Sequence, residues 1–129
     1  MNRVERVEEG GCVVVALHGE HDVFTAPEVR EHVHGAVENG RPVVVDLMDA
    51  TFIDSSILAA LLGGLRRARE GGTGYAIALE RRADAVGRIL EVTGLWPVFP
   101  ILPSREEALE AARSGASAPE GEASQAHGR

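Results

Sequence analysis

The chain of 129 residues has a net charge of −7 and 44% apolar residues, which indicates one soluble domain that builds its own core. The acidic balance excludes sequence-independent binding to nucleic acid phosphates. The single cysteine, Cys12, excludes an internal disulfide and stands in an apolar run, where we expect a buried and inert thiol.

Strand and helix patterns alternate along the chain. Two strand patterns joined by a Gly-Gly turn predict an antiparallel hairpin, and the helices that separate the later strands predict parallel pairing with right-handed crossovers. The order β-β-α-β-α-β-α-β-α predicts an α/β fold with a mixed, mostly parallel sheet of about five strands packed with about four helices. The expected strands are 3–9, 12–19, 41–48, 75–80 and 96–102, and the expected helices are 25–40, 55–69, 83–93 and 104–113.

Capping signals mark the start of two of these helices. Thr25 with Glu28, and Ser104 with Glu107, have the spacing of a capping box, in which each side chain binds a backbone N–H group of the other residue. The last strand pattern contains two prolines, which confines it to a sheet edge.

Apolar periodicity ends near residue 114. The remaining residues are mainly Gly, Ala, Ser, Pro and Glu, a composition that cannot bury enough apolar surface to fold. We therefore expect one domain over residues 1–113 and a disordered C-terminal tail over residues 114–129.

The stretch FIDSSILAALLGG, residues 52–64, places an acid and two serines directly before an apolar helix. Three interpretations compete: a helix cap, a nucleophile and a site of modification. As a cap, Asp54 accepts hydrogen bonds from the free N–H groups of the first helical turn. The cap explains Asp54 but not the two successive hydroxyls of Ser55 and Ser56.

A nucleophilic serine requires a neighbouring base. The sequence lacks a Gly-x-Ser-x-Gly elbow, a Gly-rich phosphate loop and a paired metal motif. His18, His21 and Asp22 stand close together after a strand, where they could hold a metal only weakly, and we expect solvent-facing loop histidines instead. The chain is therefore expected to be no enzyme and to need neither cofactor nor metal.

Phosphorylation fits a helix N-terminus, because the free N–H groups and the positive end of the helix dipole favour an anion there. A phosphate would place its charge beside Asp54, with Asp22 and Asp46 at neighbouring strand ends. We expect such a change to alter docking without unfolding the domain.

The helix over residues 55–69 is apolar around more than one stripe. Its leucines can face the sheet and leave Ile57 or Ala60 elsewhere, and Gly63-Gly64 permits close approach of another backbone. Such a helix is either covered by another element or used as an interface. The sequence leaves both possibilities open.

The chain resembles the STAS domain, specifically the bacterial anti-sigma factor antagonist family. The resemblance rests on LHGEHDVFTAPEV after the second strand, on VVVDLMDATFIDSS at the third, and on the order of elements, and it covers residues 4–113. It implies that the unphosphorylated protein binds an anti-sigma factor that is also an ATP-dependent serine kinase, which frees a sigma factor in transcription control such as a stress response. The serine that this kinase phosphorylates matches Ser55, and a serine phosphatase would restore it.

The implied partner-binding residues are Asp22, Asp54, Ser55, Ser56 and Ile57. The family commonly has glycine where this chain has Ile57, and we expect that side chain to lie exposed on the first helical turn as an anchor for the partner. The protein is expected to be cytoplasmic, monomeric or weakly dimeric, and without a nucleic acid or membrane partner. The alternatives are a scaffold or sensor subunit of a larger signalling assembly without obligatory phosphorylation and, more distantly, a serine-dependent hydrolase.

Overall fold

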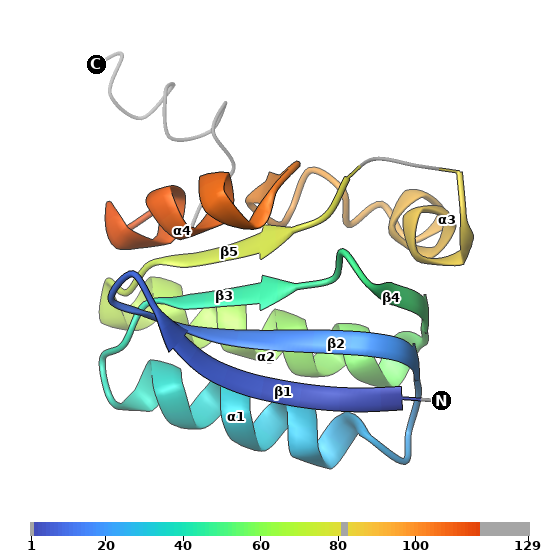
Figure 1. Cartoon of the computed structure of the whole chain (residues 1–129), viewed down its shortest axis with the longest axis horizontal. Helices are drawn as coiled ribbons and strands as arrows, with labels where there is room; N and C mark the ends of the chain where they lie inside the picture. The colour runs from blue at the N-terminus through green and yellow to red at the C-terminus, as the bar shows by residue number, and fades with distance from the viewer. Residues whose placement is uncertain (1, 81–82, 117–129) are drawn as a thin grey trace.

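The computed structural model describes residues 2–80 and 83–116. Within these ranges the chain forms six strands and four helices around one mixed sheet (Figure 1). The expected α/β class, with a mostly parallel sheet and four helices, is confirmed, and one strand more than expected is present. The elements are β1 (Asn2–Glu9), β2 (Cys12–His21), α1 (Ala26–Glu38), β3 (Val43–Asp46), β4 (Ala50–Ile53), α2 (Ser55–Gly71), β5 (Tyr75–Ala78), α3 (Ala85–Val92), β6 (Ile101–Leu102) and α4 (Arg105–Arg113).

The strand order is β1-β2-β3-β5-β6, and β4 pairs with the end of β2 beyond β3. The β1–β2 pair is antiparallel and every other pair is parallel. The additional strand is β4, in the segment expected to lead from a strand into the second helix; its pairing with β2 is interrupted by a register shift at Gly19 and Glu20. Because β2, β3, β4 and β5 run in one direction, their carboxyl ends meet at one end of the molecule.

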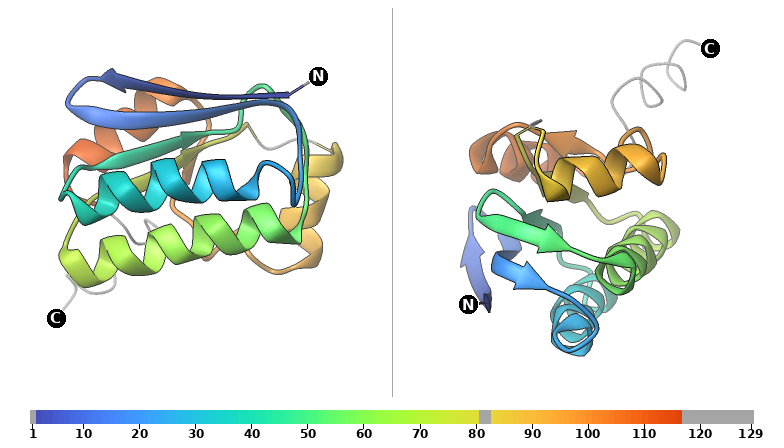
Figure 2. Two further views of the ribbon diagram at one scale, coloured as in Figure 1. Left: turned by 90° about the horizontal axis from the view of Figure 1, so that it is seen from below. Right: turned by 90° about the vertical axis from the view of Figure 1, so that its right-hand side faces the viewer.

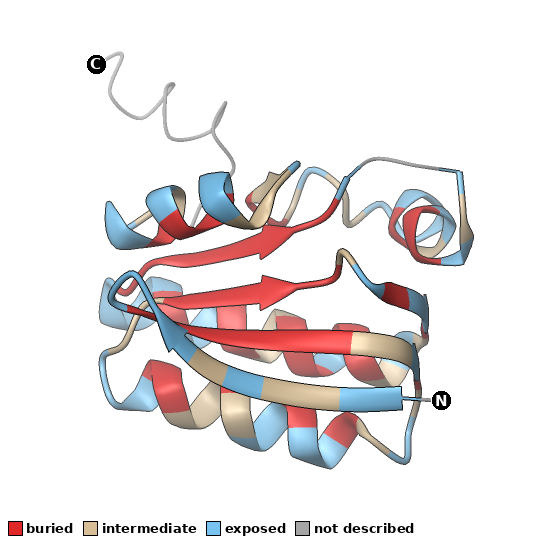
Figure 3. Ribbon diagram, in the orientation of Figure 1, coloured by how far each residue is buried: buried red, intermediate tan, exposed pale blue. Residues whose placement is uncertain are grey.

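The sheet is covered on both faces. Helices α1 and α2 pack on one face and α4 packs on the other (Figures 1 and 2). Along β2 the side chains divide accordingly, since Val13 and Val15 belong to the cluster under α1 and α2 while Cys12 and Val14 belong to the cluster under α4. Burial on both faces explains the nearly continuous apolar runs of β2, β3 and β5 (Figure 3). The expected burial of Cys12 is confirmed, and desolvation raises the pKa of its thiol.

The two capping boxes have different outcomes. Ser104 Oγ accepts a hydrogen bond from Glu107 N at 3.1 Å, which is the half of the box that caps the helix, while the Glu107 carboxylate accepts from the Ser104 hydroxyl at 3.0 Å and not from the Ser104 backbone N–H. Thr25 is the N-cap residue of α1, but its side chain makes no capping bond to the helix. The predicted box at Thr25 is therefore wrong, because its hydroxyl is engaged with the preceding loop instead.

The last two elements differ in length from expectation. Only Ile101–Leu102 of the predicted strand over 96–102 pairs with the sheet, beside β5. After α4 the chain remains in contact with the sheet as far as Ala116, whose carbonyl oxygen accepts a hydrogen bond from Tyr75 N at 2.7 Å. Three residues of the predicted tail thus belong to the fold, and residues 117–129 lie outside the described residues.

Helix α1 packs along the side of α2. Of the two possibilities that the sequence left open for the apolar surface of α2, coverage by another element is the one observed there. Gly64 lies at the contact, where an added Cβ would come within 2.5 Å of Val33 Cγ1 and 3.0 Å of the Tyr75 ring. The Tyr75 hydroxyl donates to the Leu61 carbonyl oxygen at 2.8 Å in the same region. The absent side chain of Gly64 therefore sets how closely α2 approaches α1 and the sheet.

We predict that Gly64→Ala lowers the free energy of unfolding by about 1–3 kcal/mol, the usual cost of overpacking a core. The control is Gly71→Ala in the same helix, where the new Cβ has its nearest neighbour at 3.6 Å. That change should leave stability unchanged or raise it by up to about 1 kcal/mol through helix propensity. Urea denaturation of both variants measures the difference, and equal stability of the two would show that Gly64 does not set the helix spacing.

Candidate functional site

The predicted site residues lie at the end of the sheet where the parallel strands finish. Asp22 follows β2, and Asp54, Ser55 and Ser56 follow β4, which is the neighbour of β2. Helices α1 and α2 lie side by side and both begin at this end (Figure 2). The topology therefore brings together two segments that are about thirty residues apart in the sequence.

Asp54 caps α2. Its backbone is extended, and its Oδ1 accepts hydrogen bonds from Ser56 N at 3.0 Å and Ile57 N at 3.2 Å. The same oxygen accepts a hydrogen bond from Ser56 Oγ at 2.6 Å. Desolvation raises the pKa of the Asp54 carboxyl, but the hydrogen bonds from Ser56 and Ile57 together outweigh it and hold the pKa below its ordinary value. The carboxylate form is therefore favoured in the folded protein.

The two serines differ in what their hydroxyls can do. Ser56 is half-buried and its hydroxyl donates to the Asp54 carboxylate. Ser55 is exposed, and across residues 2–80 and 83–116 its hydroxyl has no hydrogen-bond partner. As the first residue of α2, Ser55 lies where the backbone N–H groups of the first turn face outward. Of the two hydroxyls, the one at Ser55 is open to an incoming group.

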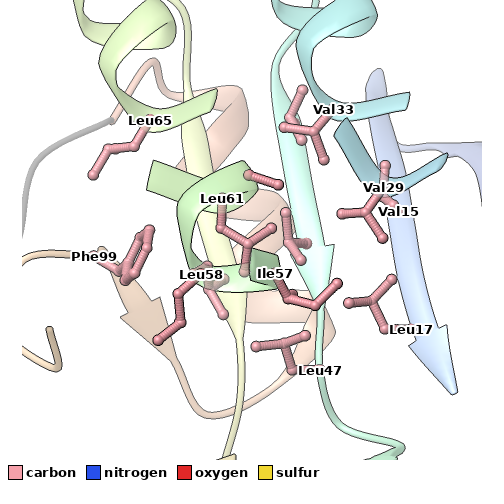
Figure 4. Close-up of a cluster of buried hydrophobic side chains, with 14 of the residues drawn as sticks. Val15, Leu17, Val29, Val33, Leu47, Ile57, Leu58, Leu61, Leu65 and Phe99 are labelled. Atoms are coloured by element: carbon pink, nitrogen blue, oxygen red, sulfur yellow. The ribbon is translucent and has the colours of Figure 1, made fainter. Parts of the chain in front are cut away.

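Ile57 is not on the surface. Its side chain is 0% exposed and belongs to the cluster between the sheet and the helices. In Figure 4 it lies with Leu17, Leu47 and Leu61 inside that cluster. The expectation of an exposed anchor at Ile57 is therefore wrong: two residues after Ser55, the helix has already turned this position toward the core.

The loop after β2 is organised by Asp22 and Thr25. Asp22 Oδ1 accepts a hydrogen bond from Phe24 N at 3.0 Å, and the Asp22 carbonyl oxygen accepts from both Thr25 N and Ala26 N at 3.0 Å. Thr25 Oγ1 lies 3.0 Å from Nδ1 of His21. These bonds fix the path of the chain from β2 into α1.

His21 is part of this arrangement and is 0% exposed, so the expectation of a solvent-facing histidine is wrong there. Its Nε2 donates to the His18 carbonyl oxygen at 2.9 Å. Its other ring nitrogen meets Thr25, which leaves no atom of the imidazole for a metal. Among the described residues no group of three His, Cys, Asp or Glu side chains is arranged to hold a metal ion.

The hydrolase interpretation lacks a histidine base bonded to either serine. In the described part of the chain the histidine rings of His18, His21 and His34 make their contacts with other groups, and none bonds to Ser55 or Ser56. Ser56 has a carboxylate as its partner instead, which serves the helix cap.

No helix in the described part of the chain is long and apolar enough to cross a membrane.

Comparison with known proteins decides the family. The model of the STAS domain matches residues 3–108. The chain belongs to the STAS domain family. The anti-sigma-B factor antagonist of Staphylococcus aureus (strain NCTC 8325 / PS 47) is 31% identical over 94 residues, which are 71% of this chain and 84% of that protein. The anti-sigma-B factor antagonist of Bacillus subtilis (strain 168) is 28% identical over 89 residues, 69% of this chain and 80% of that protein.

A solved structure agrees with these relatives. The crystal structure of an anti-sigma factor antagonist from Mycobacterium paratuberculosis matches with a TM-score of 0.74 and 28% identity, over 88% of this chain and 95% of that one. The resemblance found in the sequence is thereby confirmed, and this STAS domain is grouped with anti-sigma factor antagonists.

Sequence reasoning missed three exposed apolar side chains at the same end of this STAS domain. Val23 and Phe24, in the loop after β2, are 60% and 87% exposed, and Phe52 on β4 is 42% exposed. The signal was present in the sequence, since Val-Phe stands between an aspartate that makes a turn and the residue that precedes a helix. Nothing in the core pattern required apolar residues there.

We predict that Ile57→Ala lowers the free energy of unfolding by about 2–5 kcal/mol, the cost of truncating a buried isoleucine. The cause is loss of packing in the cluster of Figure 4. Thermal or urea denaturation measures it, and Ala59→Gly, at an exposed position of the same helix, controls for a general weakening of α2. A loss below about 1 kcal/mol, typical of surface changes, would contradict the burial of Ile57.

The Asp54 cap predicts a dependence on pH. Asp54→Ala should cost about 0.5–2 kcal/mol at neutral pH, the usual value of an N-cap. Because the pKa of Asp54 is lowered by folding, its contribution is complete above the unfolded pKa, about 3.9, and is lost as the pH falls through the lower folded value. The stability gap between wild type and variant should therefore shrink below about pH 4. A gap that does not change down to the acid transition would show that the charge of Asp54 contributes nothing.

Proposed function

We propose that this protein is an anti-sigma factor antagonist whose binding is controlled by phosphorylation of Ser55. In the unphosphorylated form it binds an anti-sigma factor that is also a serine kinase, and so releases a sigma factor for transcription. Phosphorylation of Ser55 by that kinase ends the binding, and a serine phosphatase restores it. The protein acts in the cytoplasm as a regulator and needs no cofactor.

The observation that carries this proposal is the difference between the two serine hydroxyls. Ser56 is engaged with the Asp54 carboxylate at 2.6 Å, whereas Ser55 is exposed at the first position of α2. A kinase can reach the Ser55 hydroxyl without breaking the cap. Two curated relatives, both named anti-sigma-B factor antagonists, supply the class of partner.

The helix N-terminus supports the phosphorylated state. The modification adds about −1.5 to −2 charges at neutral pH, and the positive end of the α2 dipole favours an anion at this position. The N–H groups of Ser56 and Ile57 already donate to Asp54, so the dipole supplies this support. The same charge lies beside the Asp54 carboxylate, so the acidic character of this end increases sharply. The domain stays folded while the surface that a partner must desolvate becomes more costly to bury.

The partner-binding residues in this proposal are Asp22, Asp54, Ser55 and Ser56, which the topology brings to one end. Ile57 acts differently from the sequence expectation. As a buried residue it fixes the start of α2 from within, and a partner does not touch its side chain. The larger side chain at the family's glycine position therefore does not obstruct a kinase, since it points into the core.

Three serine variants test the switch. With the purified anti-sigma factor kinase of the source organism and ATP, wild type should take up one phosphate at Ser55, located by mass spectrometry. Ser55→Ala should remain folded, stay unmodified and keep its affinity, because the replaced side chain is exposed. Ser55→Asp should fold and bind at least about tenfold more weakly, a change of about 1.4 kcal/mol.

The matched control is Ser56→Ala, which should still be phosphorylated at Ser55. Its loss of the bond to Asp54 should lower stability by about 0.5–1.5 kcal/mol, the net value of one hydrogen bond. Phosphate found on Ser56 or Thr51 would overturn the assignment of Ser55. Tight binding without phosphorylation, together with assembly into a large stable particle, would favour the scaffold or sensor alternative.

A further inference from the structure

Val23 and Phe24 form the most conspicuous apolar exposure of the described chain. Phe24 is 87% exposed and Val23 is 60% exposed, and they are adjacent in the loop between β2 and α1. Exposing a phenylalanine in this way forgoes the favourable free energy of burying its ring. No packing requirement of this fold explains the two side chains, because Ala26 and Val29, which follow them, supply the contacts of α1 with the core.

The loop that carries these side chains is fixed at its backbone. The amides of Phe24, Thr25 and Ala26 all donate to oxygen atoms of Asp22. The buried ring of His21 closes the arrangement through its contact with Thr25 Oγ1. Val23 and Phe24 are therefore held outward on an ordered turn, and a partner that takes them up has little backbone entropy to remove.

The position of the loop relates these side chains to Ser55. Phe24 precedes the N-cap residue of α1, and Ser55 is the first residue of α2. The two helices lie side by side and start at the same end (Figure 2). A partner that contacts Ser55 therefore meets the Val23-Phe24 turn on the neighbouring helix start.

The charges near the turn and the serines indicate which charges on a partner would be complementary. Arg3 on β1, which pairs with β2, and Arg88 on α3, which packs against β4, are basic residues of neighbouring elements. The segments 18–25 and 47–56, which carry the turn and the serines, contain four carboxylates and no arginine or lysine. These are Glu20, Asp22, Asp49 and Asp54. A partner with basic side chains around an apolar pocket matches this surface, whereas a second copy of this chain would oppose acid with acid. The occupant is therefore a different protein with a basic rim.

We propose that Val23 and Phe24 are the apolar anchor of the partner-binding surface, with Phe24 filling a pocket of the anti-sigma factor that arginine or lysine side chains border. The inference rests on the proposed function and adds to it the residue that supplies affinity. Phe24 replaces Ile57 as the expected anchor, because the side chain of Ile57 is buried in the core. The phosphate on Ser55 then lies beside the anchor without disrupting it, and weakens binding because a partner must desolvate a dianion in order to reach the anchor.

The test compares single substitutions in the full chain by calorimetric titration against the purified anti-sigma factor kinase of the source organism. Phe24→Ala should weaken binding by about tenfold or more, as expected for an aromatic hot spot. Phe24→Leu should retain part of the affinity, because it keeps an apolar side chain. Val23→Ala has a matched control in Val92→Ala, which removes the same atoms from a side chain that is 77% exposed on α3.

Val23→Ala should weaken binding and Val92→Ala should not. All four variants should melt at the wild-type temperature, since their side chains are largely exposed, and affinity should fall as salt is raised.

If Phe24→Ala binds the partner as tightly as wild type does, the anchor is overturned while the proposed function remains intact. Absence of any binding by wild type would reject the proposed function and the anchor with it. Self-association of wild type that Phe24→Ala abolishes, with partner affinity unchanged, would identify the turn as a contact between copies and also overturn the proposal.

Discussion

The Asp54 carboxylate determines where α2 begins, and the rest of the site depends on that position. One oxygen atom accepts three hydrogen bonds, from two backbone amides and from the Ser56 hydroxyl. With the start of the helix fixed, the 100° turn per residue assigns each following side chain its direction. Ser55 faces solvent, Ser56 faces its own cap, and Ile57 faces the core.

Local chemistry made much of this fold predictable. Hydrophobic runs, turn glycines and the spacing of helices gave the order of elements, the mixed sheet and the start of α2. What the sequence could not supply was contact between distant segments. Strand β4 has only four residues and pairs with β2 across a register shift. Thr51, Phe52 and Ile53 are residue types common in strands, but so short a stretch without alternation cannot be told from a connection by its pattern alone. His21 belongs to the same pairing, and its burial follows from β2 extending further than its apolar run.

The site was predicted in part for the same reason. Asp54, Ser55 and Ser56 are adjacent in the chain, and their roles follow from the rules of a helix start. The direction of Ile57 depends on where α1 and the sheet lie, and the apolar Val-Phe pair depends on what surrounds its loop. Neither the direction of Ile57 nor the exposure of the Val-Phe pair follows from helix propensity or capping rules. An apolar residue on the first turn of a helix can serve the core or a partner, and only the packing of its neighbours distinguishes the two.

The direction of the strands also separates the two ends of the molecule. Strand β2 has ten residues, so the Gly10-Gly11 turn before it stands about 33 Å from the serines beyond its other end. That turn is tied to the end of α4 by a hydrogen bond from Arg113 to the Gly10 carbonyl oxygen at 3.3 Å. A dye, a solid support or a fused domain attached at the turn would therefore leave the serines accessible. The fold can therefore be attached to a support at one end while a partner binds the serines at the other.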